Sequence, residues 1–392
     1  MNSEFKKYQA QTTPFPLMIE VSKAKGSYIY DKHNNRYLDF VAGVSACSVG
    51  HCNKDVISAI KNQSEKYMHV MVYGEFITEP SLDLAKLLSK NLPNSLNCTY
   101  FTNSGTEALE GSMKLARRHT GRTKIIAAKN AYHGSTMGAL TLMGLEERKK
   151  PFEPLIPDVE FIDFNSIEDL EKIDEKTACV ILETIQGSAG FILPKKGYLK
   201  FVKKRCQEVG ALLILDEIQT GIGRTGKLFG FENFNCTPDI IVYGKGLGGG
   251  IPIGAFTGSK QLMDVLHINP ILGHITTFGA NPVITAAALQ TLKIILNSKI
   301  MEETLLKEKL LRQKLTHKLI KEIRGIGLML CLIMKDFEIA NKLVLQAKNE
   351  GLILFWLLIE KRAVRITPPL TISEKELEEG CDIITGILDS IE

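Results

Sequence analysis

Two residues of opposite charge follow buried apolar stretches and could take part in one reaction. Asp216 ends the stretch Leu212–Asp216, and Lys245 follows Asp239–Tyr243 at the start of a glycine-rich run. A lysine amine condenses with an aldehyde cofactor, and a carboxylate can keep the ring nitrogen of such a cofactor protonated, so that the ring accepts electrons from a carbanion. A solvated loop lysine and a helix-capping aspartate are the ordinary alternative for these two stretches taken alone.

An anionic group on such a cofactor would need a binding site, and Phe101–Gly111 could supply one. A short strand there runs into a Gly/Ser/Thr turn and then a helix, so backbone N–H groups at Gly105 and Thr106 could point at the anion. An ordinary helix cap by Ser104 or Thr106 would have the same sequence. Further on, Tyr132 offers a flat surface for a stacked ring, although a buried core tyrosine is the more ordinary interpretation of that residue alone.

The stretch Gly221–Gly226 matches the dinucleotide pattern G-x-G-x-x-G, and with Lys227 it nearly matches a P-loop. Both motifs require a helix directly afterwards, and a P-loop also requires Ser or Thr after its lysine. Leu228 stands at that position, and glycine and aromatic residues without a helical period follow it. The sequence therefore disfavours a nucleotide-binding function.

The middle of the chain alternates apolar strands with helices such as Glu107–Thr120 and Leu199–Val209. The predicted strands are Lys124–Ala128, Val159–Asp163, Cys179–Glu183, Leu212–Asp216 and Asp239–Tyr243. Strands that are apolar throughout and alternate with helices predict a mostly parallel sheet covered on both faces. Ligands of such sheets bind at the carboxyl ends of the strands, where Glu183, Asp216 and Lys245 fall.

Further elements are predicted on either side of this α/β core. They are a hairpin at Gly26–Phe40, helices at Val56–Lys66 and Pro80–Leu92, a long helix from Asn281, a Lys/Glu-rich helix at Met301–Ile323 and a final helix at Ser373–Asp389. Alternating residues around a turn at His33–Asn35 indicate the hairpin, and apolar residues three and four apart indicate the helices. From about Asn281 onward the pattern indicates a separate α+β domain.

Composition argues against several other classes of protein. The 392 residues carry 48 Lys and Arg against 44 Asp and Glu, a net charge of +4, without a basic block that would suggest nucleic-acid binding. The start lacks the apolar segment of a secretory signal, and no apolar run approaches the roughly 18 residues of a membrane span. The eight cysteines form no C-x-x-C pair and no metal set, so we expect reduced thiols in a cytoplasmic protein.

Six motifs occur in order along the chain. They are N-S-G-T-E-A (103–108), Y-H-G (132–134), D-E-I-Q-T-G-I-G-R-T-G (216–226), G-K-G-L-G-G-G (244–250), T-T-F-G-A-N-P (276–282) and R-I-T-P-P-L (365–370). With them the chain resembles the class III aminotransferases, and within these the acetylornithine/ornithine aminotransferase branch, from Gly26 to its end. The resemblance implies pyridoxal phosphate (PLP) as cofactor, the α/β PLP-dependent transferase fold type I, and a homodimer with active sites at the interface. Residues 49–284 would form the large PLP-binding domain, and residues 1–48 would join a small α+β domain at 285–392.

The resemblance also implies a role for each matching residue. Lys245 would be the Schiff-base lysine and proton shuttle, and Asp216 would pair with the pyridinium nitrogen. The other cofactor-binding residues would be Gly105 and Thr106 at the phosphate, Tyr132 stacked on the ring, Gln219 at the ring hydroxyl, and Thr277, which would reach the phosphate from the partner subunit. The substrate-binding residues would be Arg365, Thr276 and Glu183, with the guanidinium fork of Arg365 matching a substrate carboxylate.

Two positions depart from the acetylornithine/ornithine pattern. Ser135 stands where those enzymes usually carry an arginine that serves as a second carboxylate anchor, and Ser188 stands where they carry the glutamate that pairs with the equivalent of Arg365. A guanidinium in a closed site without a carboxylate partner is costly. We therefore hypothesise that a substrate carboxylate lies on Arg365 in both half-reactions, which makes amines without a carboxylate poor donors.

The resulting hypothesis is an aminotransferase that moves an amino group from an amino-acid donor to a keto acid such as 2-oxoglutarate. N-acetylornithine or a related acylated diamino acid is the preferred donor. Ornithine or another ω-amino acid is the alternative donor. The same scaffold also supports PLP aminomutases, racemases and decarboxylases, and a binding protein that has lost catalysis is a more distant alternative. No nucleic acid or membrane partner is expected.

Overall fold

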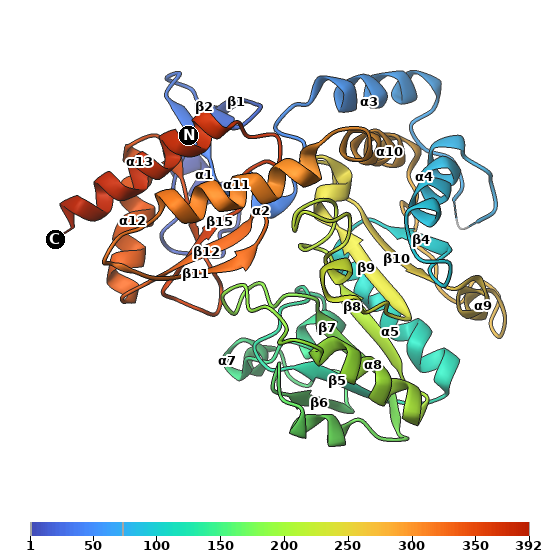
Figure 1. The fold of residues 1–392 in the computed structure, drawn as a ribbon. Coiled ribbons are helices and arrows are strands. Elements are labelled where there is room, and N and C mark those ends of the chain that lie inside the picture. Colours follow the sequence, from blue (N-terminus) through green and yellow to red (C-terminus); the bar gives the residue numbers. More distant parts are fainter. Residues whose placement is uncertain (1, 73, 392) are drawn as a thin grey trace.

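The computed structural model describes residues 2–72 and 74–391. Its centre is a seven-stranded sheet with the strand order β4-β10-β9-β8-β7-β5-β6 (Figure 1). The strands are β4 (Cys98–Thr102), β5 (Lys124–Ala128), β6 (Val159–Ile162), β7 (Thr177–Glu183), β8 (Leu212–Asp216), β9 (Ile240–Gly244) and β10 (Gly254–Gly258). Neighbouring strands from β9 to β6 run parallel, whereas β10 is antiparallel to both β4 and β9. The sheet is therefore mostly parallel, as predicted.

Alternation along each central strand divides the core into two layers. In β7, Cys179 and Ile181 belong to the cluster that includes residues of helix α5 (Gly105–Thr120), and Val180 and Leu182 belong to the cluster that includes residues of helix α8 (Tyr198–Val209). Successive side chains of a strand point to opposite faces, so a strand covered on both faces must be apolar at every position. This explains the uninterrupted apolar runs that identified these strands.

Helix α10 (Pro282–Leu296) begins directly after the last loop of the large sheet and packs on α3 (Lys54–Lys66) and α4 (Glu79–Lys90). Asn281 caps it, because its side chain accepts from the N–H groups of Val283 and Ile284. In the described part of the chain, no single helix is long and apolar enough to cross a membrane. The bent pair formed by α10 and α11 (Ile300–Lys314), at 68°, meets the length and composition criteria only when both are counted together.

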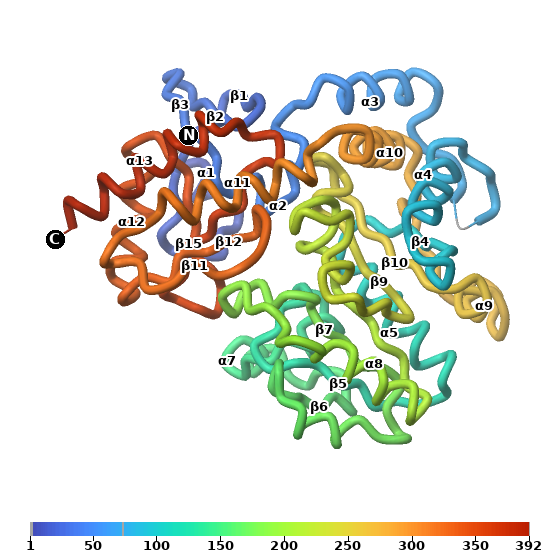
Figure 2. The backbone as a smooth tube through the Cα atoms, viewed as in Figure 1, coloured from blue at the N-terminus to red at the C-terminus, as the bar shows by residue number. Residues whose placement is uncertain are grey.

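Two four-stranded sheets make up the other side of the molecule. One contains β1 (Val21–Lys25), β2 (Tyr28–Asp31), β3 (Arg36–Asp39) and β13 (Leu352–Ile353), and the other contains β11 (Ile320–Ile326), β12 (Met329–Met334), β15 (Ala363–Ile366) and β14 (Phe355–Trp356). The strands β3 and β13 pair in parallel, with Leu38 opposite Leu352. The N-terminal (blue) and C-terminal (orange to red) segments therefore lie together in Figure 2, with α12 (Phe337–Asn349) and α13 (Glu374–Ser390) beside them. The exact division into domains stays a prediction.

The predicted helix at Met301–Ile323 is wrong in its second half. The helix α11 ends at Lys314, and after a loop at residues 315–319 the chain forms β11, which pairs antiparallel with β12. The Lys/Glu-rich composition favours a helix locally, but the ladder with β12, a strand buried along its whole length, determines the conformation from Ile320 onward. The sequence analysis also missed β10, because glycine at both ends of its G-A-F-T-G sequence weakens the strand pattern and leaves only three residues between them.

Candidate active site

A cavity of about 310 Å³ opens at the carboxyl ends of β7, β8 and β9. The ladder places Glu183 directly opposite Asp216, and Lys245 follows the last residue of β9. Seven residues predicted from the sequence line this cavity: Gly105, Thr106, Tyr132, Glu183, Asp216, Gln219 and Lys245. The sheet therefore collects side chains that are far apart in the sequence at one edge, as parallel topology requires.

Asp216 is buried, and both of its carboxylate oxygens are engaged. Its Oδ1 accepts from the N–H of Ile218 at 2.9 Å, and its Oδ2 lies 2.8 Å from Nδ1 of His133. Burial alone would lower the pKa of His133, but the hydrogen bond and charge of Asp216 raise it above its usual value. The imidazole therefore donates from Nδ1 to Asp216 and fixes the orientation of the carboxylate.

His133 is the functional residue to which the sequence analysis assigned no role. Its side chain lines the cavity, and in the part of the chain that the structure describes, its Nε2 has no hydrogen-bond partner. The only signal in the sequence was its place between Tyr132 and Gly134 in the Y-H-G motif. Its pairing with Asp216, 83 positions further on, became visible only in the fold.

Lys245 has a strained backbone and an altered basicity. Its φ of 38° lies in the left-handed region, at the start of a short 3-10 turn (Lys245–Gly248). The turn can pass this close to the N-terminal segment only because Gly246 has no side chain, since a Cβ there would lie 2.4 Å from Ser48 Oγ. Burial lowers the pKa of Lys245, and the positive charge of Arg365 lowers it further, against the raising effects of Asp216 and Glu183. A lowered pKa leaves more of the amine neutral and nucleophilic.

Glu183 connects two loops at the floor of the cavity. Its Oε1 accepts from the N–H of Tyr132 at 3.0 Å and its Oε2 accepts from the N–H of Gly187 at 2.9 Å. Burial raises the pKa of Glu183 to about 7, and the charge of Asp216 adds to this effect, while His133 opposes it. Because both oxygens are already bonded to backbone groups, this carboxyl positions the loops and is not free to swing toward another cation.

The amino end of α5 forms the second side of the cavity. Ser104 caps the helix by accepting from the N–H of Glu107 at 3.3 Å, and the first helical residues, Gly105 and Thr106, face the cavity. A side chain at Gly105 would not fit, because a Cβ there would lie 2.7 Å from Cδ1 of Ile218. The N-terminal N–H groups and positive dipole end of the 16-residue helix therefore lie at the cavity, where they could bind an anion.

Comparison with known proteins agrees with this geometry. The family model for class-III aminotransferases matches residues 8–388. The chain belongs to the class-III aminotransferases. It is 40% identical over 400 residues to the acetylornithine aminotransferase of Caldanaerobacter subterraneus subsp. tengcongensis, and the match covers 98% of each chain.

Solved aminotransferase structures have the same fold. The ornithine aminotransferase of Toxoplasma gondii superposes with a TM-score of 0.91 at 31% identity, covering 100% of this chain and 94% of that one. A second structure of that enzyme, crystallised with oxidised glutathione, has a TM-score of 0.90 at 30% identity, covers 99% and 94% of the two chains, and has PLP at partial occupancy in its active site. The predicted α/β fold of PLP-dependent transaminases is thus confirmed.

The residues of this class-III aminotransferase fit the PLP that the family implies. A partly buried lysine of lowered pKa, a buried carboxylate bonded to His133 and a helix N-terminus surround one cavity. These match an aldehyde, a ring nitrogen that must stay protonated and a phosphate, respectively. Within residues 2–72 and 74–391, no group of three or more His, Cys, Asp or Glu side chains could hold a metal ion.

Three predicted residues do not line the cavity. Thr276 lines a separate groove, where its Oγ1 accepts from the N–H of Gly279 at 2.8 Å, and Thr277 follows it in that loop. Arg365 lies in β15, 7% exposed. Burial lowers the pKa of Arg365 to about 10, and among the described residues its Nε and Nη1 have no hydrogen-bond partner. Its positive charge nevertheless contributes to lowering the pKa of Lys245.

Proposed function

We propose that this class-III aminotransferase uses PLP to move an amino group from a carboxylate-bearing donor to a keto acid such as 2-oxoglutarate. N-acetylornithine or a related acylated diamino acid is the preferred donor, in line with the enzyme names of its relatives. The observation that carries the proposal is the meeting of Lys245 and Asp216 at adjacent strand ends around one cavity.

Each residue of the cavity has a defined task in this proposal. When bound, PLP supplies an aldehyde carbon and an electron-accepting ring. Lys245 would hold that carbon and move the substrate proton with its Nζ, and Asp216, oriented by His133, would favour a positive charge on the ring nitrogen. Tyr132 would stack on the ring, and the turn at Gly105 and Thr106 would bind the phosphate. Gln219, whose Nε2 donates to Ser45 Oγ at 3.3 Å, would contact the ring hydroxyl.

Arg365 would bind the substrate carboxylate, and nothing in the described chain competes with the substrate for it. Among the described residues its Nε and Nη1 lack partners, Glu183 is held by two backbone N–H groups, and the cavity wall at position 188 is a serine. A buried guanidinium without a partner gains more from a carboxylate than one that must first release a glutamate. Donor and acceptor would therefore both carry a carboxylate, and a simple diamine would be a poor donor.

The site would be completed in a homodimer. Thr276 and Thr277 belong to a loop beside a groove with exposed apolar side chains, among them Phe76, Ile77, Ile271 and Ile275. Exposed apolar side chains gathered around one groove are typical of a protein interface. A second copy of this chain on the groove would bring Thr277 toward the partner's phosphate. A cytoplasmic location is supported by the eight free cysteines.

The first test is the visible absorption of the purified protein with PLP, before and after single donors are added without keto acid. N-acetylornithine should bleach the yellow colour of the bound aldehyde form, ornithine should do so more slowly, and putrescine should have no effect. The variant Lys245→Ala, which lacks the amine, is the control and should show neither the covalent colour nor turnover. A protein that never binds PLP would refute the proposal. Bleaching followed by turnover without any keto acid would instead indicate an aminomutase, racemase or decarboxylase.

A second experiment tests the carboxylate-binding site proposed at Arg365. The resemblance to the acetylornithine/ornithine enzymes implies that an acid in a Ser188→Glu variant pairs with Arg365, so the KM for acidic keto acids should rise roughly tenfold, the equivalent of one charge-assisted hydrogen bond. The turnover number should change less than KM. The variant Ser188→Ala is the matched control and should behave like the parent. An unchanged KM in Ser188→Glu would count against an open carboxylate site at Arg365.

A further inference from the structure

A chain of hydrogen bonds links Glu110 in α5 to Thr106 at the edge of the cavity. Glu110 Oε1 accepts from Thr136 Oγ1 at 2.6 Å, and Thr136 Oγ1 lies 2.9 Å from Thr106 Oγ1. The same glutamate oxygen accepts from the backbone N–H groups of Gly138 and Ala139 at 2.9 and 3.2 Å. Glu110 thereby fastens the loop that follows the Y-H-G motif to the helix that begins at the proposed phosphate site.

Two glycines make these contacts possible. Gly134 has a φ of 134°, and a Cβ built there would lie 2.3 Å from Thr106 Oγ1. A Cβ at Gly138 would lie 2.2 Å from Glu110 Oε2. A side chain at either position would push the loop away from α5, so the close approach of both threonines and the glutamate is built into the sequence.

The direction of the hydrogen bonds follows from counting protons. An ionised carboxylate only accepts, and a threonine hydroxyl has one proton to donate. Thr136 gives its proton to Glu110, so in the contact between the two threonines Thr106 must be the donor. The proton of Thr106 therefore points toward Thr136 and is not available to an oxygen in the cavity, although Thr106 lines that cavity.

We propose that Glu110 is a positioning residue for the phosphate-binding turn. It acts through Thr136, which accepts the proton of the Thr106 hydroxyl. The hydrogen-bonded chain Thr106–Thr136–Glu110, here called the strut, connects the start of α5 to the loop after the Y-H-G motif. The inference rests on the proposed function as a PLP enzyme. A phosphate has only acceptor oxygens when fully ionised, so it must take its hydrogen bonds from donors. With the Thr106 hydroxyl committed, those donors are the backbone N–H groups at Gly105 and Thr106, and the strut holds them in place.

The inference predicts that the two threonines act as one unit. Both Thr106→Val and Thr136→Val remove the same strut while keeping the side-chain shape, so each should weaken PLP binding by the purified apoprotein about fivefold, the factor of one neutral hydrogen bond. The double variant should bind no more weakly than either single variant. Pyridoxal without its phosphate should bind all of them as it binds the parent, because only the phosphate site is disturbed.

Conservative variants separate positioning from a general loss of structure. Glu110→Gln keeps an acceptor at Oε1 and should retain the parent's affinity for PLP, whereas Glu110→Ala should lose affinity as the threonine variants do. Thr136→Ser keeps the hydroxyl and should bind PLP normally. Thr120→Val, at the far end of α5 with its hydroxyl bonded to Ala116 O, is the matched control.

Three outcomes would overturn the inference. One is a loss above roughly tenfold in Thr106→Val with none in Thr136→Val, because a side chain that donates directly to phosphate makes the stronger charge-assisted bond. Another is an equal loss of PLP and pyridoxal affinity in every variant. The third is parent-like PLP binding by all the valine variants, in which case the proposed function stands and the strut alone is wrong. A parent protein that binds no PLP would refute the proposed function itself.

Discussion

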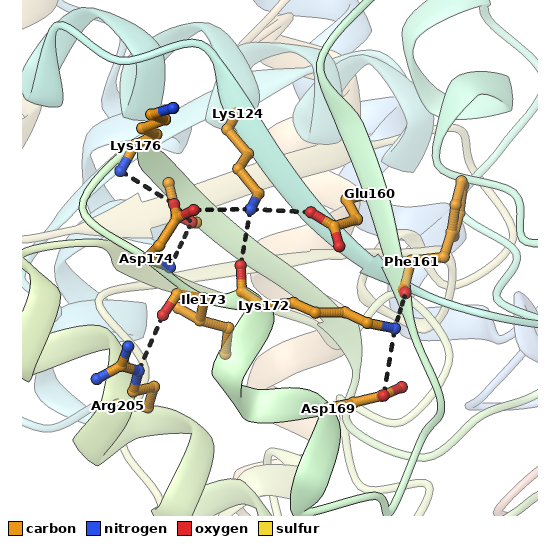
Figure 3. Close-up of polar contacts among 10 residues, drawn as sticks. Lys124, Glu160, Phe161, Asp169, Lys172, Ile173, Asp174, Lys176 and Arg205 are labelled. Carbon is orange, nitrogen blue, oxygen red and sulfur yellow. Dashed lines mark hydrogen bonds and ion pairs between the residues drawn. The ribbon is translucent and has the colours of Figure 1, made fainter.

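Charged side chains at the two ends of the parallel sheet differ in whether they have partners of opposite charge. At the amino ends of β5 to β7, Lys124 Nζ contacts Asp174 at 3.1 Å, Glu160 at 2.9 Å and the carbonyl of Lys172 at 2.8 Å (Figure 3). At the carboxyl ends, Lys245 faces the cavity with a lowered pKa. Arg365, in β15 of the neighbouring small sheet, contributes to that lowering and has two nitrogens without a partner among the described residues. The charge of Lys124 at the amino ends is balanced by acidic partners, so we call this end electrostatically complete. The positive charges near the cavity at the carboxyl ends are not balanced in this way.

This difference distinguishes charges that stabilise the fold from charges that await a ligand. An unpaired buried charge destabilises a protein, so it persists where function requires it. Glu217 sharpens the contrast, because it lies beside Asp216 at the functional end but is fully satisfied. It accepts from the hydroxyls of Thr184 and Thr220 and from the N–H groups of Gly230 and Phe231, all at 2.6 to 2.7 Å. We infer that Glu217 is structural despite its position.

The largest effect is expected at Asp216. The variant Asp216→Asn keeps the shape and can still accept from Ile218, but it no longer supplies a negative charge to a ring nitrogen. We expect the turnover number to fall by about 10²–10³-fold, as when one preorganised electrostatic group is removed, with little change in the melting temperature. Asp163→Asn, at an exposed ion pair with Lys129, is the control and should keep full activity. Retention of more than a tenth of the parent turnover in Asp216→Asn would contradict the assignment.

Arg365 tests whether the unpaired charge at the functional end acts on both substrate and lysine. In Arg365→Gln the affinity for carboxylate substrates should fall by roughly 10-fold or more, the value of hydrogen bonds to a charged group. The charge of Arg365 now adds to burial in lowering the pKa of Lys245, so its removal should raise that pKa. The rate at which the apoprotein captures PLP, which requires the neutral amine, should then reach its half-maximum at a higher pH than in the parent.

The control for this variant is Arg362→Gln. Arg362 is exposed and already paired with Glu360, three positions before Arg365. It should change neither carboxylate affinity nor the pH dependence of PLP capture. If both variants shifted the pH dependence equally, the effect would come from overall charge, and the specific coupling between Arg365 and Lys245 would be wrong.

Glu217 should affect folding more than chemistry. In Glu217→Gln an amide NH₂ replaces one acceptor oxygen and meets donors that have no other partner. Leaving such groups unsatisfied costs about 2–3 kcal/mol, which urea denaturation would register as a lower free energy of unfolding. The turnover number of the folded fraction should stay near that of the parent. A variant of normal stability but low turnover would move Glu217 from the structural to the functional group.

The sequence predicted the functional end of the sheet well because the pattern there is local. The strands β5 and β8 have the predicted bounds, Lys124–Ala128 and Leu212–Asp216, since fully apolar runs end in polar residues. Once the strands are parallel, their carboxyl ends must meet, so Asp216 and Lys245 could be placed together without coordinates.

The remaining features depend on contacts between distant segments. The insertion of β10 between β4 and β9 and the pairing of β11 with β12 depend on ladder partners that no local pattern shows. The pairing of His133 with Asp216 likewise requires the folded sheet. The serine at position 188, where an acid was expected, predicted an unpaired Arg365. Two nitrogens of Arg365 have no partner among residues 2–72 and 74–391, which agrees with that interpretation.

The smallest effect is expected at the electrostatically complete end of the sheet. In Lys124→Met the alkyl packing is kept, but the contacts to Asp174 and Glu160 are lost. Because Lys124 is only 18% exposed while its acidic partners are 36% and 44% exposed, the free energy of unfolding should fall by about 1 kcal/mol, near the upper limit for partly solvated ion pairs.

This stabilisation should depend on pH through Asp174. Burial alone would raise the pKa of Asp174, but its hydrogen bonds, the one from Lys124 foremost, lower it. The stabilisation is therefore present above the unfolded aspartate pKa of about 4 and is lost as pH falls through the lower folded value. The parent and Lys124→Met should differ in urea denaturation at neutral pH, converge in strong acid, and have equal affinity for PLP. Weaker PLP binding in Lys124→Met would show that the two ends of the sheet are coupled, and the division between them would fail.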